Sequence, residues 1–167
     1  QDSRTILSLM ERFLRANIPP ADALRTVAPA FRLRCDGTRG VTLDILMLDL
    51  FTGKGTCLKC GAAPSFLKNG GGVIRISGGN LPVGLSDEPA ADQSVPIRMG
   101  PGDLFVLVSD GICDGSDDGW LRALVQQHAK ETPKELAARL VVAAAERGSN
   151  DDLTALVCRL EHRPSSL

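Results

Sequence analysis

The sequence of 167 residues contains no tyrosine, and aromatic residues make up only 4% of it. Proteins that bind single-stranded nucleic acid stack bases on aromatic side chains, so this scarcity argues against that class. The charge is also nearly balanced, with 19 Lys and Arg against 20 Asp and Glu. Without a strongly basic balance, neither nucleic acid nor an anionic membrane surface is expected as the main partner.

Long apolar runs are absent, so no segment of the sequence predicts a membrane span. The first residues, Gln1 to Arg4, lack the pattern of a signal peptide, and a helix is predicted to begin at once. The five cysteines are odd in number and scattered, which is typical of reduced thiols in a cytosolic protein. Cys57 and Cys60 have the spacing of a zinc or redox pair, but no second pair or nearby His completes a ligand set.

The hydrophobic pattern predicts one α+β domain over residues 1–167, without repeats or linkers. Pro29 is expected to bend or shorten the second of the four predicted helices. Thr132 and Glu135 have the spacing of a capping box at the start of the fourth helix. The predicted helices cover residues 2–14, 21–33, 119–129 and 133–146, and the predicted strands cover residues 41–51, 56–61, 64–68, 73–77, 93–99, 104–108 and 153–160.

The most informative stretch is the continuous apolar run Leu104 to Val108, which predicts a buried strand that ends at Ser109-Asp110-Gly111. Two further acids, Asp151 and Asp152, stand at the start of the last predicted strand. If these two strands are antiparallel neighbours, the acid that ends one lies beside the acids that begin the other. Converging carboxylates are the ligands that Mg²⁺ and Mn²⁺ prefer. A turn-capping Asp110 and solvated acids at 151 and 152 fit the same pattern.

The remaining titratable residues allow structural as well as functional interpretations. Asp114 is either a further metal ligand or a helix cap, and Asp44, within a predicted strand, is costly unless it is paired. Asp117 and Asp118 are most simply read as charges at the N-terminus of the next helix. His128 and His162 lack the sequence context of a catalytic triad or a metal pair and are predicted to lie at the surface.

Seven short stretches in chain order resemble the type 2C metal-dependent protein phosphatases, and specifically the catalytic domain of stage II sporulation protein E. The pairing of Ser-Asp-Gly with a late Asp-Asp-x-Thr is the most specific element of this resemblance. The stretches are residues 42–44, 49–53, 61–66, 80–84, 102–104, 109–112 and 151–154.

The resemblance implies two antiparallel sheets packed as a sandwich with helices outside, and hydrolysis of phosphoserine or phosphothreonine on a protein by a water that two Mn²⁺ or Mg²⁺ ions activate. It implies that Asp110 and Asp151 are catalytic metal ligands and that Asp114 belongs to a third, weaker ion site. Asp152, Gly111 and Asp44 are expected beside the ligands rather than among them.

The sequence departs from the family pattern because the family's early motifs are absent. In the family, these motifs supply an Asp that bridges both metals and a backbone carbonyl ligand. We therefore expect a catalytic domain without its N-terminal strands, with weak metal binding and little activity on its own. Exposed sheet edges and apolar surface are expected to favour a homodimer.

The resemblance further implies a phosphorylated anti-anti-sigma factor as the substrate during sporulation. It also implies a cytoplasmic domain that is tethered to a membrane in the full-length protein. Two alternatives stay open: a degenerate phosphatase fold that binds a protein without chemistry, and a two-metal phosphoesterase for small substrates.

Overall fold

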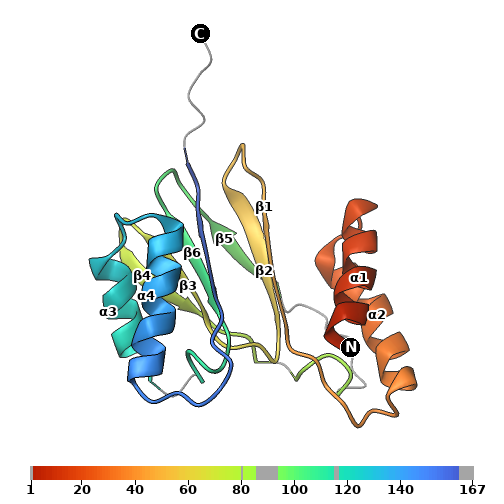
Figure 1. Cartoon of the computed structure of the whole chain (residues 1–167). Coiled ribbons are helices and arrows are strands. Elements are labelled where there is room, and N and C mark those ends of the chain that lie inside the picture. The colour runs from red at the N-terminus through yellow and green to blue at the C-terminus, as the bar shows by residue number, and fades with distance from the viewer. Residues whose placement is uncertain (1, 80, 86–93, 115–116, 162–167) are drawn as a thin grey trace. The chain divides into compact units, whose positions relative to one another are not determined.

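The computed structural model describes residues 2–79, 81–85, 94–114 and 117–161, and within them the chain forms four helices and seven strands. These elements divide into two compact units, which are described separately (Figure 1). The prediction of a single domain over 1–167 stays a prediction. Predicted features at Asn80, Gln93 and His162 lie outside the described residues.

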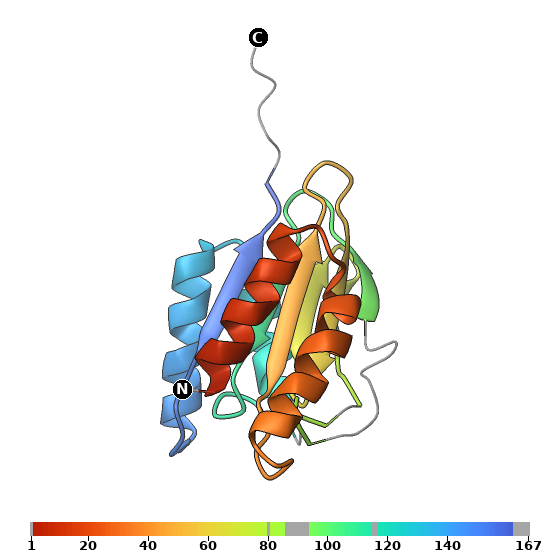
Figure 2. The ribbon, with the colours of Figure 1, turned by 90° about the vertical axis from the view of Figure 1, so that its right-hand side faces the viewer.

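The first unit (1–47, 56–62 and 78–96) begins with a helical hairpin of α1 (Asp2–Arg15) and α2 (Pro20–Arg34), seen side by side in Figure 2. The apolar stripe of α1 buries Ile6 and Met10 against Leu24 and its neighbours in the core of this unit. Asn17, at a positive φ of 59°, turns the chain after α1 as predicted. Of the two expected effects of Pro29, the shortening does not occur, because α2 continues through Pro29 to Arg34.

A three-stranded sheet has the order β1 (Leu43–Leu48), β2 (Lys54–Cys60), β5 (Ser94–Arg98). Strand β1 is shorter than the predicted run 41–51 because the Asp49 carboxylate starts a turn. Asp49 Oδ1 accepts hydrogen bonds from the backbone N–H groups of Phe51 (2.8 Å) and Thr52 (3.3 Å). These bonds also lower the pKa of Asp49.

The second unit (48–55, 63–77 and 97–167) contains an antiparallel sheet with the order β4-β3-β6-β7. Strand β6 (Leu104–Val108) lies between two neighbours, and all its residues except Leu107 are buried, as the continuous apolar run predicts. The other strands of this sheet are β3 (Ser65–Asn69), β4 (Gly72–Ile76) and β7 (Ala155–Arg159).

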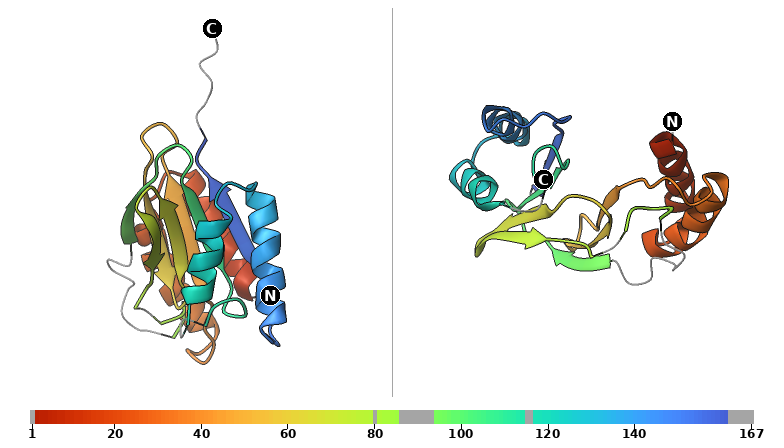
Figure 3. Two further views of the ribbon diagram at one scale, coloured as in Figure 1. Left: turned by 90° about the vertical axis from the view of Figure 1, so that its left-hand side faces the viewer. Right: turned by 90° about the horizontal axis from the view of Figure 1, so that it is seen from below.

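Helices α3 (Gly119–Gln127) and α4 (Pro133–Glu146) lie side by side on one face of this sheet (Figures 1 and 3). Their apolar sides, with Leu121 and Leu140 fully buried, form the core of the unit together with β6. The predicted capping box at Thr132 and Glu135 is present, with both of its hydrogen bonds formed. Within the described residues, none of the helices combines the length and the apolar content needed to cross a bilayer.

Candidate functional site

The pairing of β6 with β7 brings together two loops that are distant in sequence. Val108 pairs with Ala155, and Leu104 pairs with Arg159, so the end of β6 lies beside the start of β7. The prediction that these strands are antiparallel neighbours is confirmed. The Ser-Asp-Gly segment after β6 therefore lies next to the Asp-Asp segment before β7.

Ser109 joins the two loops through three hydrogen bonds. Its hydroxyl donates to the backbone carbonyl of Asp152 and accepts from the backbone N–H of Thr154, both at 2.9 Å. Its own backbone N–H donates to the carbonyl of Thr154, also at 2.9 Å. The sequence showed Ser109 only as the end of a strand, and its role depends on a partner 43 positions away.

Gly111 allows the closest approach between the loops. A Cβ atom at this position would lie 2.5 Å from the carbonyl oxygen of Asp152 and 3.2 Å from Cβ of Asp151, so no larger residue fits without a shift of the backbone. The carbonyl of Gly111 in turn accepts a 2.7 Å hydrogen bond from the Ser149 hydroxyl. Both loops are thus fixed at short range around Asp110 and Asp151.

Asp110 and Asp151 line the same open pocket, which has a volume of about 570 Å³ and also includes Asp114. Each of the first two carboxylates accepts a hydrogen bond from the next residue in its own loop. The distances are 3.1 Å from Gly111 N to Asp110 Oδ1 and 2.7 Å from Asp152 N to Asp151 Oδ1. These bonds orient the carboxylates, whose residues remain solvent-exposed.

The pocket suits a hard divalent cation in part. Carboxylate oxygens are the preferred ligands of Mg²⁺ and Mn²⁺, and Asp110 and Asp151 present them at one place. Among the residues that the structure describes, however, no group of three His, Cys, Asp or Glu side chains is placed to hold a metal ion. The described residues therefore offer two ligands of such a site but not a closed set.

Asp114 and Asp152 are the other two acids of these loops that the resemblance singles out. Both residues are exposed, and Asp152 contributes its backbone carbonyl to the contact between the loops. The expectation that Asp44 lies beside these acids stays a prediction. Asp44 belongs to β1 of the first unit, where it forms a 2.5 Å ion pair with Lys59, whose side chain is fully buried.

The ion pair with Lys59 compensates the charge of Asp44, which explains how strand β1 accommodates an acid. The Asp44 carboxylate also lies 3.4 Å from the Cys57 thiol, which donates to it. Burial, with the charge of Asp44, raises the pKa of Cys57 to about 12 and that of Cys60 to about 11. Such thiols are unreactive at neutral pH, which argues against a redox function for this pair.

Asp118 lies at the start of α3, as the sequence predicts, but it is also buried, which the sequence did not indicate. Its side chain is only 6% exposed and lies between two arginines, at 2.9 Å from Arg122 Nε and 3.3 Å from Arg75 Nη1. Arg75 comes from β4, so the sequence around Asp118 could not reveal the pairing. Asp117 does act at the helix start, where its carboxylate accepts from Gly119 N at 3.1 Å.

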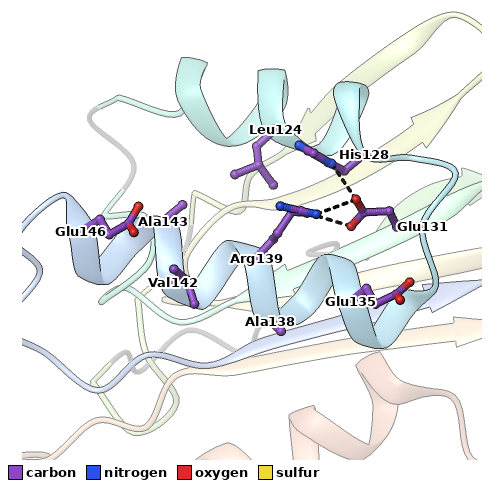
Figure 4. A pocket seen from close by; sticks show the side chains of 9 residues that line it. All are labelled: Leu124, His128, Glu131, Glu135, Ala138, Arg139, Val142, Ala143 and Glu146. Carbon is purple, nitrogen blue, oxygen red and sulfur yellow. Dashed lines mark hydrogen bonds and ion pairs between the residues drawn. The ribbon is translucent and has the colours of Figure 1, made fainter.

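His128 is partly buried rather than a surface residue, and it lines a second pocket of about 620 Å³ between α3 and α4 (Figure 4). Its Nδ1 lies 2.8 Å from Glu131 Oε1, and the Arg139 guanidinium donates two 2.8 Å hydrogen bonds to the same carboxylate. These bonds lower the pKa of Glu131 to about 2. The cluster therefore joins the C-terminal end of α3 to the middle of α4 through compensated charges, and it contains no nucleophile.

Comparison with known proteins points to one family. The family model described as stage II sporulation protein E (SpoIIE) matches residues 3–161. Stage II sporulation protein E of Bacillus subtilis (strain 168) is 30% identical over 169 residues, which cover 96% of this chain and 20% of that protein. The chain thus spans about a fifth of the length of this curated relative.

Solved structures agree with this result. A structure of the PP2C phosphatase domain and a regulatory-domain fragment of SpoIIE from Bacillus subtilis has a TM-score of 0.85 and 28% identity, over 98% of this chain and 49% of that chain. A manganese-presoaked structure of the SpoIIE phosphatase domain from the same organism has a TM-score of 0.66 and 29% identity, over 94% of this chain and 72% of that chain. The predicted α+β fold of the type 2C phosphatases is confirmed.

Proposed function

Because the chain belongs to the stage II sporulation protein E family, we propose that it is part of a metal-dependent protein serine/threonine phosphatase. This membership confirms the resemblance seen in the sequence. The proposal depends mainly on one observation, the convergence of Asp110 and Asp151 on a single exposed pocket. A carboxylate pair where buried strand β6 ends beside the start of β7 is rigid and accessible, as a hydrolytic site requires.

In this proposal the residues of the chain bind a metal ion and hold the two acid-bearing loops in place. Asp110 and Asp151 hold a divalent cation, Mn²⁺ or Mg²⁺, with the oxygens that their own loops leave available. When bound, such a cation lowers the pKa of water and offsets the charge of a phosphate group. Ser109 and Gly111 keep the two loops at the distance that joint binding needs, and Asp114 contributes to a further, weaker site.

We further propose that this chain supplies only part of the metal site. Two oriented carboxylates are few for a hard cation, because Mg²⁺ and Mn²⁺ bind tightly only where several oxygens converge. The solved SpoIIE structures are also longer than this chain, which spans 49% of one of them. Residues 1–167 alone are therefore expected to bind metal weakly and to hydrolyse phosphoserine slowly.

The substrate, partners and location are proposals as well. Family membership supports a phosphorylated anti-anti-sigma factor as the substrate, a cytoplasmic position for this domain and a membrane tether elsewhere in the full-length protein. A homodimer is supported by the second unit, in which strand β7 lies at the edge of the sheet and Leu156 on it is 58% exposed.

One observation favours a second candidate function. Since no group of three metal-ligating side chains occurs among the described residues, a phosphatase fold that binds its partner protein without hydrolysing it fits the same structure. The two candidates differ in turnover but agree on a protein partner.

A turnover experiment separates them. The chain, extended upstream to the full length of a SpoIIE phosphatase domain, is assayed on a phosphoserine protein with and without Mn²⁺. We expect Mn²⁺-dependent release of phosphate that falls by at least about a hundredfold in Asp110→Asn and Asp151→Asn. Glu161→Gln, which removes an exposed acid after β7, serves as the charge-matched control. Metal-independent activity, or full activity of both variants, would contradict the proposal.

A further inference from the structure

Arg147 is the one cationic side chain among the described residues that line the acid-rich pocket. It follows α4 directly, where its backbone N–H caps the helix by donating to carbonyls of the last turn. Its side chain thus reaches the pocket from a fixed backbone position. Three of the acids that line the same pocket, Asp110, Asp151 and Asp117, come from the loops on either side of it.

The guanidinium of Arg147 lies over the Trp120 ring, 5.0 Å from the ring centroid. A cation at this distance from the face of an indole is attracted to it, which favours one orientation of the flexible arginine side chain. Its ion pair with Asp117 is long, with 3.7 Å between Nη2 and Oδ2, and the Arg147 side chain stays 52% exposed. Within the part of the chain that the structure describes, this is its only ion pair.

An arginine in this position is prepared to bind an anion. Its side chain is oriented by stacking rather than by close hydrogen bonds, so its N–H donors can turn to a ligand. The planar guanidinium matches two oxygens of a phosphate group, which it binds by parallel charge-assisted hydrogen bonds. An arginine with a structural role commonly donates these hydrogen bonds to a carboxylate, as Arg139 does to Glu131.

We propose that Arg147 binds the phosphate group of the substrate beside Asp110 and Asp151, with Trp120 as the platform that orients it. This inference rests on the proposed function of the pocket. A phosphate dianion that enters a pocket lined by carboxylates meets repulsion, and the cation of Arg147 offsets part of it. Arg147 is accordingly a substrate-binding residue, whose loss weakens binding more than turnover.

The sequence offers a direct probe, because Trp120 is the only tryptophan of the chain. Inorganic phosphate is titrated into the upstream-extended protein, in which any tryptophan of the added segment is replaced by phenylalanine, with and without Mn²⁺, while Trp120 fluorescence is recorded. We expect a saturable change whose midpoint rises about tenfold or more in Arg147→Ala, and less in Arg147→Lys, which keeps the charge but loses the fork. Lys134→Ala removes an exposed charge from the same helix and should leave the midpoint unchanged.

Kinetics on a phosphoserine protein distinguish binding from a structural role. In Arg147→Ala we expect KM to rise about tenfold while kcat changes by less than about threefold, with Arg147→Lys between this variant and the wild type. An unchanged KM and an unchanged phosphate midpoint would overturn the proposal, and a lowered melting temperature with both unchanged would make Arg147 a purely structural residue. If the wild type shows no turnover, the proposed function fails, but the phosphate titration still decides the role of Arg147.

Discussion

The Ser109 hydroxyl donates a 2.9 Å hydrogen bond to the backbone carbonyl of Asp152, 43 positions further along the chain. The same hydroxyl accepts a bond from the N–H of Thr154. One small side chain therefore uses its donor and an acceptor to join the loop of Asp110 to the loop of Asp151. The geometry of the acid pair depends on this contact as much as on the acids themselves.

Replacing Ser109 by alanine removes both side-chain bonds and leaves two backbone groups to find other partners. We expect the free energy of unfolding to fall by about 1–3 kcal/mol, as measured by urea denaturation. Mn²⁺ affinity of the upstream-extended protein, measured by calorimetry, should fall several-fold, because the two loops are no longer fixed. Ser8→Ala on the exposed side of α1 is the control, and equal behaviour of the two variants would refute the role of Ser109.

Replacing Gly111 by alanine places a methyl group 2.5 Å from the carbonyl oxygen of Asp152. Because atoms do not approach so closely, the two loops must separate. We expect Mn²⁺ affinity and phosphatase turnover to fall by about tenfold or more, with loss of stability of about 1–3 kcal/mol. Gly70→Ala is the matched control, since a Cβ there meets nothing within 4 Å. Normal metal binding by Gly111→Ala would show that the close approach is not needed.

Replacing Lys59 by methionine leaves the carboxylate of Asp44 without its buried cation. Breaking such a pair by removing one partner typically costs about 3–5 kcal/mol, and we expect the lower end because Asp44 keeps 14% of its side-chain surface exposed. The double variant with Asp44→Leu should recover much of this loss, because an apolar pair replaces both charges. Urea denaturation of the wild type, the two single variants Lys59→Met and Asp44→Leu, and the double variant measures the coupling, and additive losses would contradict it.

The buried thiols of Cys57 and Cys60 predict a loss of stability in alkali. Their pKa values in the folded chain are raised to about 12 and about 11, whereas an unfolded thiol has a pKa of 9.0. The unfolded state therefore releases these protons first, so the stabilisation is complete below pH 9 and is lost as the pH rises toward 11 and 12. Denaturation of wild type and of Cys57→Ala/Cys60→Ala between pH 8 and 10.5 tests this, and equal pH slopes would contradict it.

Arg139 is expected to control the titration of Glu131, whose pKa it lowers to about 2 together with His128. In Arg139→Ala the pKa of Glu131 should rise toward its ordinary value of 4.5, as measured by NMR of the carboxyl carbon. The stabilisation from this low pKa is present above pH 4.5 and is lost as the pH falls toward 2. Glu135, whose pKa is lowered mainly by Thr132, is the internal control and should change little.

The convergence of Asp110 and Asp151 could be predicted from the sequence because its causes are local and periodic. A continuous apolar run marks β6, an abrupt polar segment marks its end, and acids mark the start of β7. Antiparallel pairing of two such strands then leaves little freedom in where their ends lie. The start of α4 was predictable for the same reason, since Thr132 and Glu135 bond to each other within one helical turn.

The features that escaped prediction depend on partners from distant elements. Asp118 is buried because Arg75 reaches it from β4, and Lys59 is buried because Asp44 faces it from the neighbouring strand. His128 is drawn into a helix-to-helix contact by Glu131 and Arg139. A single sequence shows that such residues are charged, but only the fold shows which charge lies next to which.

The pairing of Val108 with Ala155 has a consequence for how this domain can be altered. The spacing of Asp110 and Asp151 is set by the pairing of Val108 with Ala155 and by the Ser109 hydroxyl, not by the length of the segment that separates the two acids. The loop that joins α3 to α4 can therefore accept inserted residues, in evolution or in protein engineering, while Asp110 and Asp151 keep their spacing. Lys130 is exposed, but Arg159 of β7 donates hydrogen bonds to the carbonyls of Ala129 and Glu131 on either side of it, so an inserted peptide must leave these two contacts in place.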